Sequence, residues 1–418
     1  MNLTAWSETA LLIAFILYCA AFIGFVIAIA GKKWSQREPE THTGKWGRRS
    51  VAAAAAGFAA HLFFFASRWY AAGHIPTSNM FEFITFLTMM IVAAFLVVYA
   101  LYRSVILGLF AMPVAILLLS YAAVFPKEVQ PLIPALQSKW LYIHVTLAAT
   151  GEAFFAVGFA AGLMYLLRII DYSSQEKADR NRRRGVEAVM YLIMSVVGFI
   201  LVTNLFSAAG YHAEFEVHKI ERDAAGAPVV VSQTVEYGLP PFVRPSGSEA
   251  VAVDPFLGLS GGLEAPGWMK GNNSARNLNT IIWSLLTGLV LYWLLRAIIR
   301  KPLGAVLQRT MGNIEADDLD EISYRAIAIG YPIFALGGLL FAMIWAHEAW
   351  GRFWGWDPKE TWALITFLFY TAYLHLRLSR GWQGEKSSWL SVIGFAVVMF
   401  TLVGVNLVIA GLHSYAGV

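Results

Sequence analysis

Long apolar stretches are the feature that most constrains how this chain can fold. An α-helix needs about 20 predominantly apolar residues to cross a bilayer. Hydrophobic residues make up 58% of the 418 and charged residues only 14%, whereas a soluble domain carries about a quarter charged residues. The sequence therefore predicts an all-α polytopic membrane protein with about ten transmembrane helices. They are expected near residues 8–30, 50–68, 80–101, 104–125, 139–169, 187–209, 278–299, 325–346, 360–378 and 388–411.

Lysine and arginine are distributed unequally between the two sides of this arrangement. The loops on one side carry 21 basic residues, and those on the other side carry ten. Five of these ten lie in one long insert, which the charge rule for short loops does not count. Cytoplasmic loops are the ones enriched in Lys and Arg. We therefore expect a multi-pass protein of the cytoplasmic (inner) membrane, with both termini, the Trp-rich loop at residues 345–362 and the insert on the extracytoplasmic, or periplasmic, side.

The insert, residues 210–277, is the one sizeable water-soluble segment that the sequence predicts. Apolar and polar residues alternate in EFEVHKI and VVVSQTVEY, on either side of the turn-prone DAAGAP, which predicts a β-hairpin. The Gly- and Pro-rich stretches GLPPFVRPSGSE and GLSGGLEAPG favour irregular structure. We expect structural roles for His212 and His218. The chain thus divides into six transmembrane helices (1–209), the insert (210–277) and four more helices (278–418).

Five of the fifteen tryptophans lie within eighteen residues, in WAHEAWGRFWGWDPKETW (345–362). Each Trp offers a large flat ring and one N–H donor, so the cluster predicts a surface for a large, flat, mostly apolar ligand such as a porphyrin. The alternative is an aromatic girdle at the membrane interface, although such a belt normally spreads its Trp over several helix ends. The candidate ligand-binding residues are Trp350, Gly351, Arg352, Trp354, Trp356, Asp357, Lys359 and Trp362.

The end of this segment has the pattern of a helix start. Asp357 is expected as N-cap, Pro358 in the first turn and Glu360 three residues after the cap. Arg352 and Lys359 are candidate partners for ligand carboxylates, because Arg in particular can bind a carboxylate through two parallel hydrogen bonds.

Four of the nine histidines lie in or beside apolar stretches: His61, His144, His375 and His413. An ionisable side chain inside a membrane span is costly and indicates function. Neutral imidazole is a common axial ligand of haem iron, so four such residues could hold two haems. The alternative is that each imidazole only bonds a carbonyl or hydroxyl of a neighbouring helix.

The depths of these histidines favour two pairs. At about 1.5 Å per residue, His144 and His413 lie within one or two turns of the outer surface, level with the Trp-rich segment. His61 lies roughly 18 Å from the cytoplasmic end of its helix, whereas His375 precedes Arg377 by two residues and is much shallower. The inner pair is therefore less well matched in depth.

Together these residues resemble the cytochrome c assembly proteins of the CcsA/ResC type, within a superfamily of haem-handling membrane proteins that share a Trp-rich WWD signature. WGRFWGWDPKETW matches that signature, and GHIPTSNMFEF and GVNLVIAGLHSY match further parts of the family. The resemblance implies haem b (iron protoporphyrin IX) as cofactor. It also implies that His144 and His413 ligate the haem presented on the WWD surface, and that His61 and His375 ligate a second haem within the membrane.

The resemblance further implies haem transport or presentation across the cytoplasmic membrane and covalent attachment of haem to the CxxCH motif of apocytochrome c. Holocytochrome c synthase activity is expected only in complex with a ResB/CcsB-like membrane protein. A separate thiol-reducing system is also expected, because the single cysteine, Cys19, cannot form an intrachain disulfide or a CxxC motif. The lipid bilayer is the other partner, and no nucleic acid is expected.

Two features depart from the family pattern. His347 stands where the family usually has a polar amide, and the insert is longer than expected. The runner-up function is an electron-transfer cytochrome b with permanently bound haem, in which an exposed Trp-rich loop has no role. A solute transporter would require discontinuous helices and polar clusters at the membrane midplane, and the sequence shows few.

Overall fold

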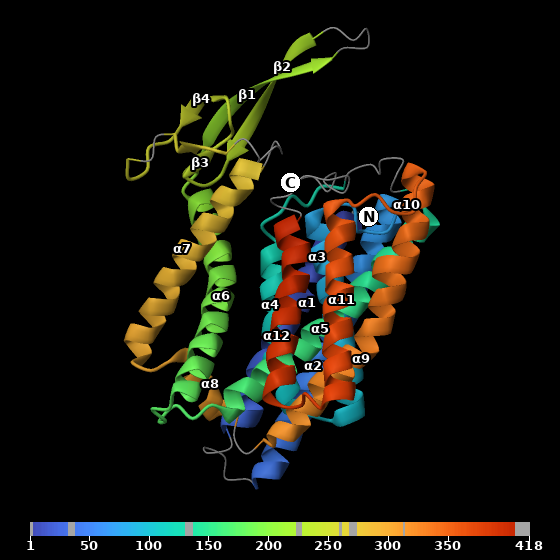
Figure 1. Ribbon diagram of the computed structural model, residues 1–418, viewed down its shortest axis with the longest axis vertical. Helices are drawn as coiled ribbons and strands as arrows, with labels where there is room; N and C mark the ends of the chain where they lie inside the picture. Colours follow the sequence, from blue (N-terminus) through green and yellow to red (C-terminus); the bar gives the residue numbers. More distant parts are fainter. Residues whose placement is uncertain are drawn as a thin grey trace. The chain divides into compact units, whose positions relative to one another are not determined.

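The computed structural model describes residues 3–31, 38–129, 137–222, 228–258, 261–266, 274–311 and 314–405. The chain divides into two compact units (Figure 1). The first combines Met1–Ala188 with Arg300–Met399, and the second contains Val189–Ile299. All of the candidate haem ligands that the structure describes belong to the first unit.

The first unit is a bundle of long helices (Figure 1). One of its long segments consists of α9, a π-helical stretch η3 and α10 in direct succession. The elements are α1 (Leu3–Ala30), α2 (Pro39–Ala72), α3 (Met80–Tyr102), α4 (Val105–Ala122), α5 (Lys139–Ile169), α8 (Leu303–Thr310), α9 (Ala316–Phe334), η3 (Ala335–Phe341), α10 (Ala342–Trp350), α11 (Pro358–Arg380) and α12 (Glu385–Met399).

Nine helical segments within the described residues are long and apolar enough to cross a membrane. This confirms a polytopic, mostly helical membrane protein. The expected span at 360–378 is the 23-residue helix α11. It is not among the nine segments, because His375, Arg377 and several tyrosines make it less apolar. It nevertheless packs on α9 and α12 within the bundle. The expected last span, 388–411, extends beyond the described residues, which end at 405.

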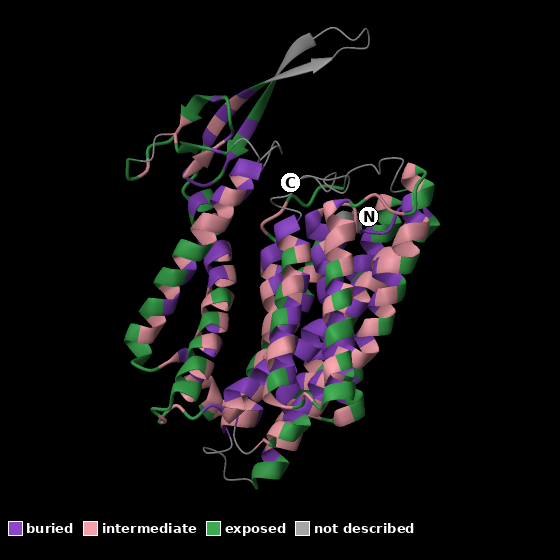
Figure 2. Cartoon of the chain, in the orientation of Figure 1, coloured by how far each residue is buried: buried purple, intermediate pink, exposed green. Residues whose placement is uncertain are grey.

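Helix α5 is the central element of the bundle and contacts α3, α9 and α12. Buried residues occupy its length from Ala149 to Leu167 (Figure 2). A Cβ on Gly151 would lie 2.6 Å from Cβ of Phe334, and one on Gly158 would lie 2.7 Å from the Ile327 side chain. Small residues allow membrane helices to approach closely, so these glycines set the fit between α5 and α9.

A buried ion pair joins α9, α11 and α12 near the C-terminal end of α11. Arg377 donates to Oδ1 of Asp320 at 2.8 Å and to Oγ of Ser387 at 2.8 Å, and Ser387 donates to the same carboxylate oxygen at 2.7 Å. Because each charge is matched and hydrogen-bonded, the pair can be buried without an uncompensated charge.

The second unit contains α6 (Lys177–Ala208) from Val189 onward, α7 (Ser274–Ile299) and the insert. The two helices touch at glycines, since a Cβ on Gly198 would lie 2.7 Å from the backbone nitrogen of Gly288. The insert is tied to the first turns of α7: Asn279 and the Trp283 indole N–H both donate to the Pro240 carbonyl.

The predicted β-hairpin is confirmed. Strands β1 (Ala213–Arg222) and β2 (Pro228–Tyr237) pair antiparallel, from Ala213 opposite Tyr237 to Arg222 opposite Pro228. The expectation that the rest of the insert is irregular was wrong. Strand β4 (Ser248–Val253) pairs with the free edge of β1, and the two-residue strands β3 (Val243–Arg244) and β5 (Leu263–Glu264) pair in parallel. The alternation in SEAVAV carried a strand signal that the surrounding glycines and prolines obscured.

Candidate functional site

His144 lies on α5 near the end of the bundle where α10 ends and α11 begins, which we call the Trp-rich end. Its Nδ1 lies 2.9 Å from the carbonyl oxygen of Gly337 in η3. A carbonyl can only accept, so Nδ1 carries the proton and donates it, and the ring's lone pair is on Nε2. Metal-binding histidines almost always donate their second ring N–H to a carbonyl or carboxylate. His144 therefore has the tautomer that iron ligation through Nε2 requires.

The carbonyl that His144 contacts lies within the π-helical stretch η3. A π-helix replaces the normal i→i−4 hydrogen bonds by wider ones and occurs frequently at functional sites. Gly337 also lets the two backbones meet, because a Cβ there would overlap the backbone nitrogen of Ala148 and lie 2.6 Å from the carbonyl carbon of Leu147. The sequence GG in this stretch thus brings η3 against α5 at the level of His144.

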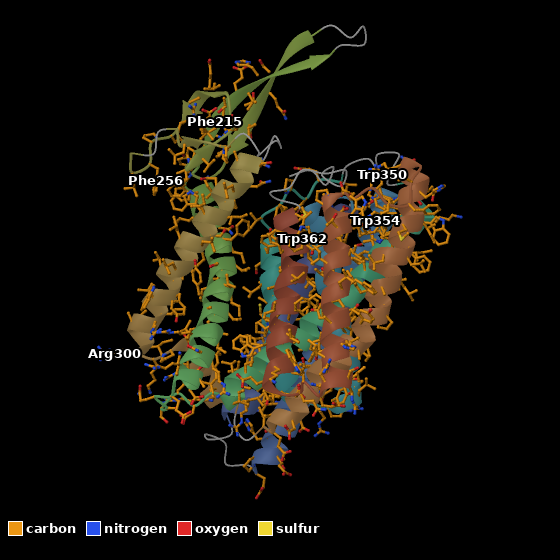
Figure 3. The ribbon with its side chains drawn as sticks, in the orientation of Figure 1. Phe215, Phe256, Arg300, Trp350, Trp354 and Trp362 are labelled. Atoms are coloured by element: carbon orange, nitrogen blue, oxygen red, sulfur yellow. The ribbon has the colours of Figure 1, made fainter. Side chains whose placement is uncertain are left out.

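The His144 ring contacts an aromatic side chain at the Trp-rich end, where Trp350, Trp354 and Trp362 also lie (Figure 3). The imidazole stacks on Trp345, with centroids 5.6 Å apart and planes inclined by 12°. Trp345 is 2% exposed and meets Trp350 edge-on at 4.9 Å. One turn away on α5, Trp140 stacks on Phe341 at 5.8 Å. The Trp-rich segment is therefore packed directly against the helix that carries the candidate ligand.

The loop between α10 and α11 presents aromatic rings outward. Helix α10 ends at Gly351, whose φ of 71° favours glycine and whose N–H donates to the His347 carbonyl at 2.8 Å. Trp356 has a φ of 57°, a left-handed conformation that is costly for a bulky residue and that concentrates at functional sites. Its ring is 70% exposed and meets Trp354 edge-on at 5.9 Å. An exposed indole held by a strained backbone favours a binding surface over simple packing.

The predicted start of α11 is confirmed. Asp357 is the N-cap and accepts from the Lys359 backbone N–H at 3.2 Å, and Glu360 completes the capping box by accepting from the Asp357 N–H at 3.2 Å. Glu360 also accepts from the Gly355 N–H at 2.7 Å, so the same carboxylate fixes the loop. Asp357 is buried and its capping role accounts for its place in the sequence.

The two candidate cations of the loop differ in their surroundings. Arg352 is exposed, and its guanidinium lies where a Cβ on residue 355 would be, so Gly355 is required for this packing. Lys359 is half-buried in the first turn of α11. His347, the departure from the family pattern, stacks on Phe353 with centroids 4.2 Å apart, which gives it a packing role in the loop.

The inner pair, His61 and His375, is not brought together. His61 on α2 is 1% exposed, and its Nδ1 lies 3.3 Å from the hydroxyl of Tyr18 on α1. Its Nε2 is buried and has no hydrogen bond of normal geometry among the described residues, although the Thr85 backbone on α3 lies close to the ring. His375 is exposed on α11, which packs on α9, η3 and α12, whereas α2 packs on α1, α3 and α4.

The fourth candidate ligand, His413, lies outside the described residues. Within those residues no group of three or more His, Cys, Asp or Glu could hold a metal ion. The two histidines of the insert have polar partners: His212 lies 2.8 Å from Glu214, and His218 lies 2.9 Å from the Ser232 hydroxyl. Both contacts agree with the structural roles expected for them.

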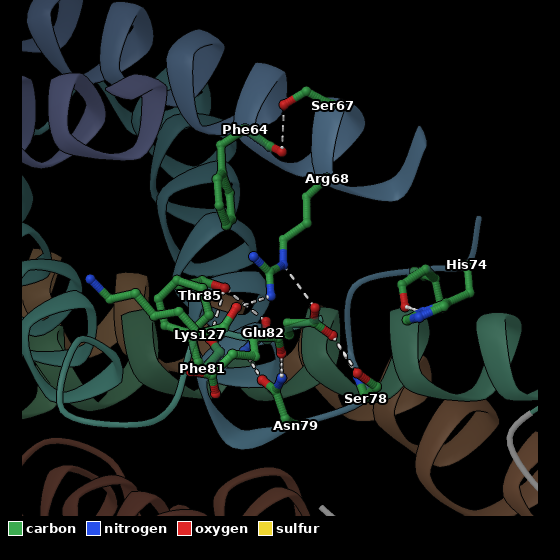
Figure 4. Close-up of polar contacts among 12 residues, drawn as sticks. Phe64, Ser67, Arg68, His74, Ser78, Asn79, Phe81, Glu82, Thr85 and Lys127 are labelled. Atoms are coloured by element: carbon green, nitrogen blue, oxygen red, sulfur yellow. Dashed lines mark hydrogen bonds and ion pairs between the residues drawn. The ribbon is translucent and has the colours of Figure 1, made fainter. Parts of the chain in front are cut away.

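Sequence reasoning missed a buried ion pair at the junction of α2 and α3 (Figure 4). Arg68 Nε donates to Glu82 at 2.7 Å, and Arg68 Nη2 donates to the Lys127 carbonyl at 2.6 Å. Glu82 also accepts from the backbone N–H and hydroxyl of Ser78, while Asn79 caps α3. These residues explain the motif GHIPTSNMFEF, in which the polar positions cap a helix and neutralise a buried arginine.

A second missed residue is Glu152, in the middle of α5. The carboxylate oxygen Oε2 is buried without a hydrogen-bond partner among the described residues. The rule that an ionisable residue inside a span indicates function was applied to the histidines, and the same rule would have found this glutamate.

The sequence of the chain is similar to those of known proteins. The model of the family described as "Cytochrome C assembly protein" matches residues 77–210 and 280–413. The match includes the Trp-rich segment, His144, His375 and His413, and it leaves out His61 and most of the insert.

Curated relatives cover most of the chain. The cytochrome c biogenesis protein CcsA of Nostoc punctiforme is 33% identical over 353 residues, which is 84% of this chain and 83% of that protein. The proteins of the same name from Crocosphaera subtropica and Gloeothece citriformis are 32% and 33% identical over 84% of this chain, covering 82% and 81% of their own lengths. The chain thus belongs to the cytochrome c assembly protein family.

Proposed function

We propose that this protein acts in cytochrome c maturation by presenting haem b at the Trp-rich end and by taking part in its covalent attachment to apocytochrome c. The observation that supports the proposal is the set of contacts that His144 makes. Its Nδ1 proton is fixed by the Gly337 carbonyl, its ring lies on the buried Trp345, and the exposed ring of Trp356 lies in the adjoining loop. A ligand histidine beside an aromatic platform is suited to bind a porphyrin by its iron and its face.

The remaining candidates complete this site in the proposal. Trp350, Trp354 and Trp362 contact the macrocycle, Arg352 and Lys359 bind the propionates, and His413 is the second axial ligand. The site lies on the extracytoplasmic side of the cytoplasmic membrane, because the loops on the opposite side carry the larger share of Lys and Arg.

His61 is the better supported of the two inner ligands. In the described part of the chain its buried Nε2 has no hydrogen bond of normal geometry, as a ligand position inside the membrane would require. Within the described residues, His375 is exposed on α11, whose main neighbours are α9, η3 and α12 and not α2. A second haem held by both residues would therefore require α2 and α11 to approach each other.

The bond-forming chemistry belongs to the haem and the substrate. Each CxxCH thiol adds across a vinyl group, so that a C–S bond forms at one vinyl carbon and a proton is taken up at the other. The protein orients the haem and limits its oxidation. A separate thiol-reducing system keeps the substrate cysteines reduced, because Cys19 is the chain's only cysteine. A ResB/CcsB-like membrane protein is the proposed partner.

The proposal is tested by purifying the protein with its partner and measuring haem transfer to a CxxCH peptide. We expect Soret absorption typical of two histidine ligands, followed by a covalent haem–peptide adduct detected by mass. A peptide with both cysteines replaced by alanine is the matched control and should remain unmodified. Stable haem that is never transferred would favour the electron-transfer cytochrome instead.

A further inference from the structure

Helix α11 has a buried face that is polar. The structure describes every residue of this helix, and the buried ones are Thr366, Tyr370, Tyr373 and Arg377. Their spacing of three and four residues places them on one side of the helix. Polar and ionisable residues within membrane helices face the bundle interior or a water-filled cavity, and they mark pathways for ions or protons. The buried face of α11 therefore differs from the apolar contact that packing alone would require.

The neighbouring helices α9 and α12 contribute further hydroxyl groups to this interior. Their buried serines include Ser323 on α9 and Ser387, Ser388 and Ser391 on α12. Oγ of Ser323 lies 2.8 Å from the Gly158 carbonyl oxygen and 3.3 Å from Oγ of Ser391. The Tyr373 hydroxyl lies close to the side chains of Ser323 and Ser387. Hydroxyl groups from three helices are thus gathered in one place.

These groups follow α12 from one end of the bundle toward its middle. Ser387 bonds to the ion pair near the C-terminal end of α11. Ser391 lies one turn further along α12. One more turn leads to Gly394, where a Cβ would lie 3.0 Å from the Tyr370 hydroxyl oxygen. The rise from Ser387 to Gly394 is about 10 Å, so the polar row extends from the ion pair to Tyr370.

Three hydroxyl groups of the row have no protein partner. The side-chain oxygens of Tyr370, Tyr373 and Ser388 are buried and make no hydrogen bond of normal geometry among the described residues. Each of the three side chains is at most 1% exposed. A buried hydroxyl without a hydrogen bond is costly, so nearly all such groups in proteins are satisfied by protein atoms or by ordered water. Buried water typically makes about three hydrogen bonds to groups of this kind.

We propose that bound water lies between α9, α11 and α12 and links Tyr370, through the hydroxyl row, to the Asp320–Arg377 ion pair. Each water molecule donates to one member of the row and accepts from the next, which satisfies the three hydroxyls. The ion pair lies near the C-terminal end of α11, so water enters from that end. The row gives bulk water a polar route to the middle of the bundle. This inference does not depend on the proposed haem site.

Water itself is the probe in the first experiment. The whole protein in lipid nanodiscs is transferred into water enriched in the heavy oxygen isotope and exposed to a short X-ray pulse. The pulse converts bound water into hydroxyl radicals that oxidise adjacent side chains, and mass spectrometry locates the isotope. Tyr370 and Tyr373 should be labelled severalfold faster than Phe25, a ring that is equally buried against Phe95 of α3. Labelling of both tyrosines no faster than Phe25 would overturn the inference.

Thermal unfolding tests the hydroxyl groups one at a time. Ser323→Ala is the matched control, because its hydroxyl has protein partners and its loss should lower the Tm. Ser388→Ala should lower the Tm by a similar amount if water binds this hydroxyl. Tyr370→Phe, which retains the ring stack on Phe155, should also lower the Tm. Removing a buried hydroxyl that has no partner is instead stabilising, so a rise in Tm in Ser388→Ala or Tyr370→Phe would count against bound water.

Discussion

His144 and His61 are both imidazoles on membrane helices, but their second ring nitrogens have different partners. The partner of His144 Nδ1 is a backbone carbonyl, which can only accept, so one tautomer is fixed. The partner of His61 Nδ1 is the Tyr18 hydroxyl, which can donate or accept, so both tautomers are open. His144 is also half-buried, whereas His61 is 1% exposed.

In the proposed haem-binding function, this difference would separate a prepared ligand, His144, from one that can adapt, His61. A ring whose proton is fixed by the backbone always presents the same nitrogen to an iron ligand. A ring beside a hydroxyl can move its proton when a ligand arrives or leaves. The first arrangement suits haem that must be held in one orientation for attachment, and the second suits haem that passes through.

Replacing the prepared ligand should have the largest effect. We expect His144→Gly to abolish cytochrome c maturation and to remove the bis-histidine spectrum, since the axial nitrogen is lost. Added imidazole should partly restore both by filling the vacant coordination position. His218→Gly, which changes a histidine bonded to Ser232 in the insert, should leave maturation unchanged.

Replacing the inner histidines, His61 and His375, tests the other half of the comparison. If haem passes through an inner site, His61→Gly and His375→Gly should each lower haem occupancy at the Trp-rich end, measured by Soret absorbance per protein. Unchanged occupancy in both variants would show that these two residues are structural.

Disturbing the carbonyl that orients His144 should have the next largest effect. In Gly337→Ala the new Cβ overlaps the α5 backbone at Ala148, so η3 must move away and the Nδ1 bond is lost. Overpacking of this kind typically costs about 1–3 kcal/mol, and loss of a partner that orients a metal ligand typically weakens binding about 10–100-fold. Thermal unfolding and haem affinity measure the two effects.

The neighbouring glycine is the matched control for this variant. The three atoms nearest to a Cβ on Gly338 all belong to the ring of Phe334, at 3.0 Å or more, and none to the α5 backbone, so Gly338→Ala should retain most of the haem affinity. Equal losses in the two variants would argue that packing of η3, and not the Gly337 carbonyl, determines binding.

The aromatic loop should contribute less than the axial ligand. Trp354→Ala should lower haem occupancy while the protein still inserts and folds, because it removes one ring of the loop between α10 and α11. Asp357→Asn should be nearly silent, because Asn caps a helix about as well as Asp. Severe haem loss in Asp357→Asn at a normal protein level would show that this carboxylate orients a ligand histidine instead.

What the sequence could predict depended on how local each signal was. The apolar runs, the β-hairpin and the Asp357 cap are written in consecutive residues, and the structure contains them. The bond from His144 to Gly337 joins residues 193 positions apart and depends on a π-helical stretch. The wider π-helical bonding around Gly337 has no simple residue pattern. The pairing of His61 with His375 came from the family resemblance, whereas helix packing places the two residues on different neighbours.

The smallest effect is expected at the hydroxyl beside His61. Tyr18→Phe removes one hydrogen bond, which typically contributes about 0.5–1.5 kcal/mol, and leaves the tilted ring contact of residue 18 with His61 in place. Since His61 can place its proton on either nitrogen, Nε2 stays available to iron, and haem occupancy at the Trp-rich end should not change. Thermal unfolding and Soret absorbance of the purified variant measure both quantities. Haem loss as large as in His144→Gly would mean that the Tyr18 hydroxyl fixes one tautomer of His61, and the contrast between the two histidines would no longer hold.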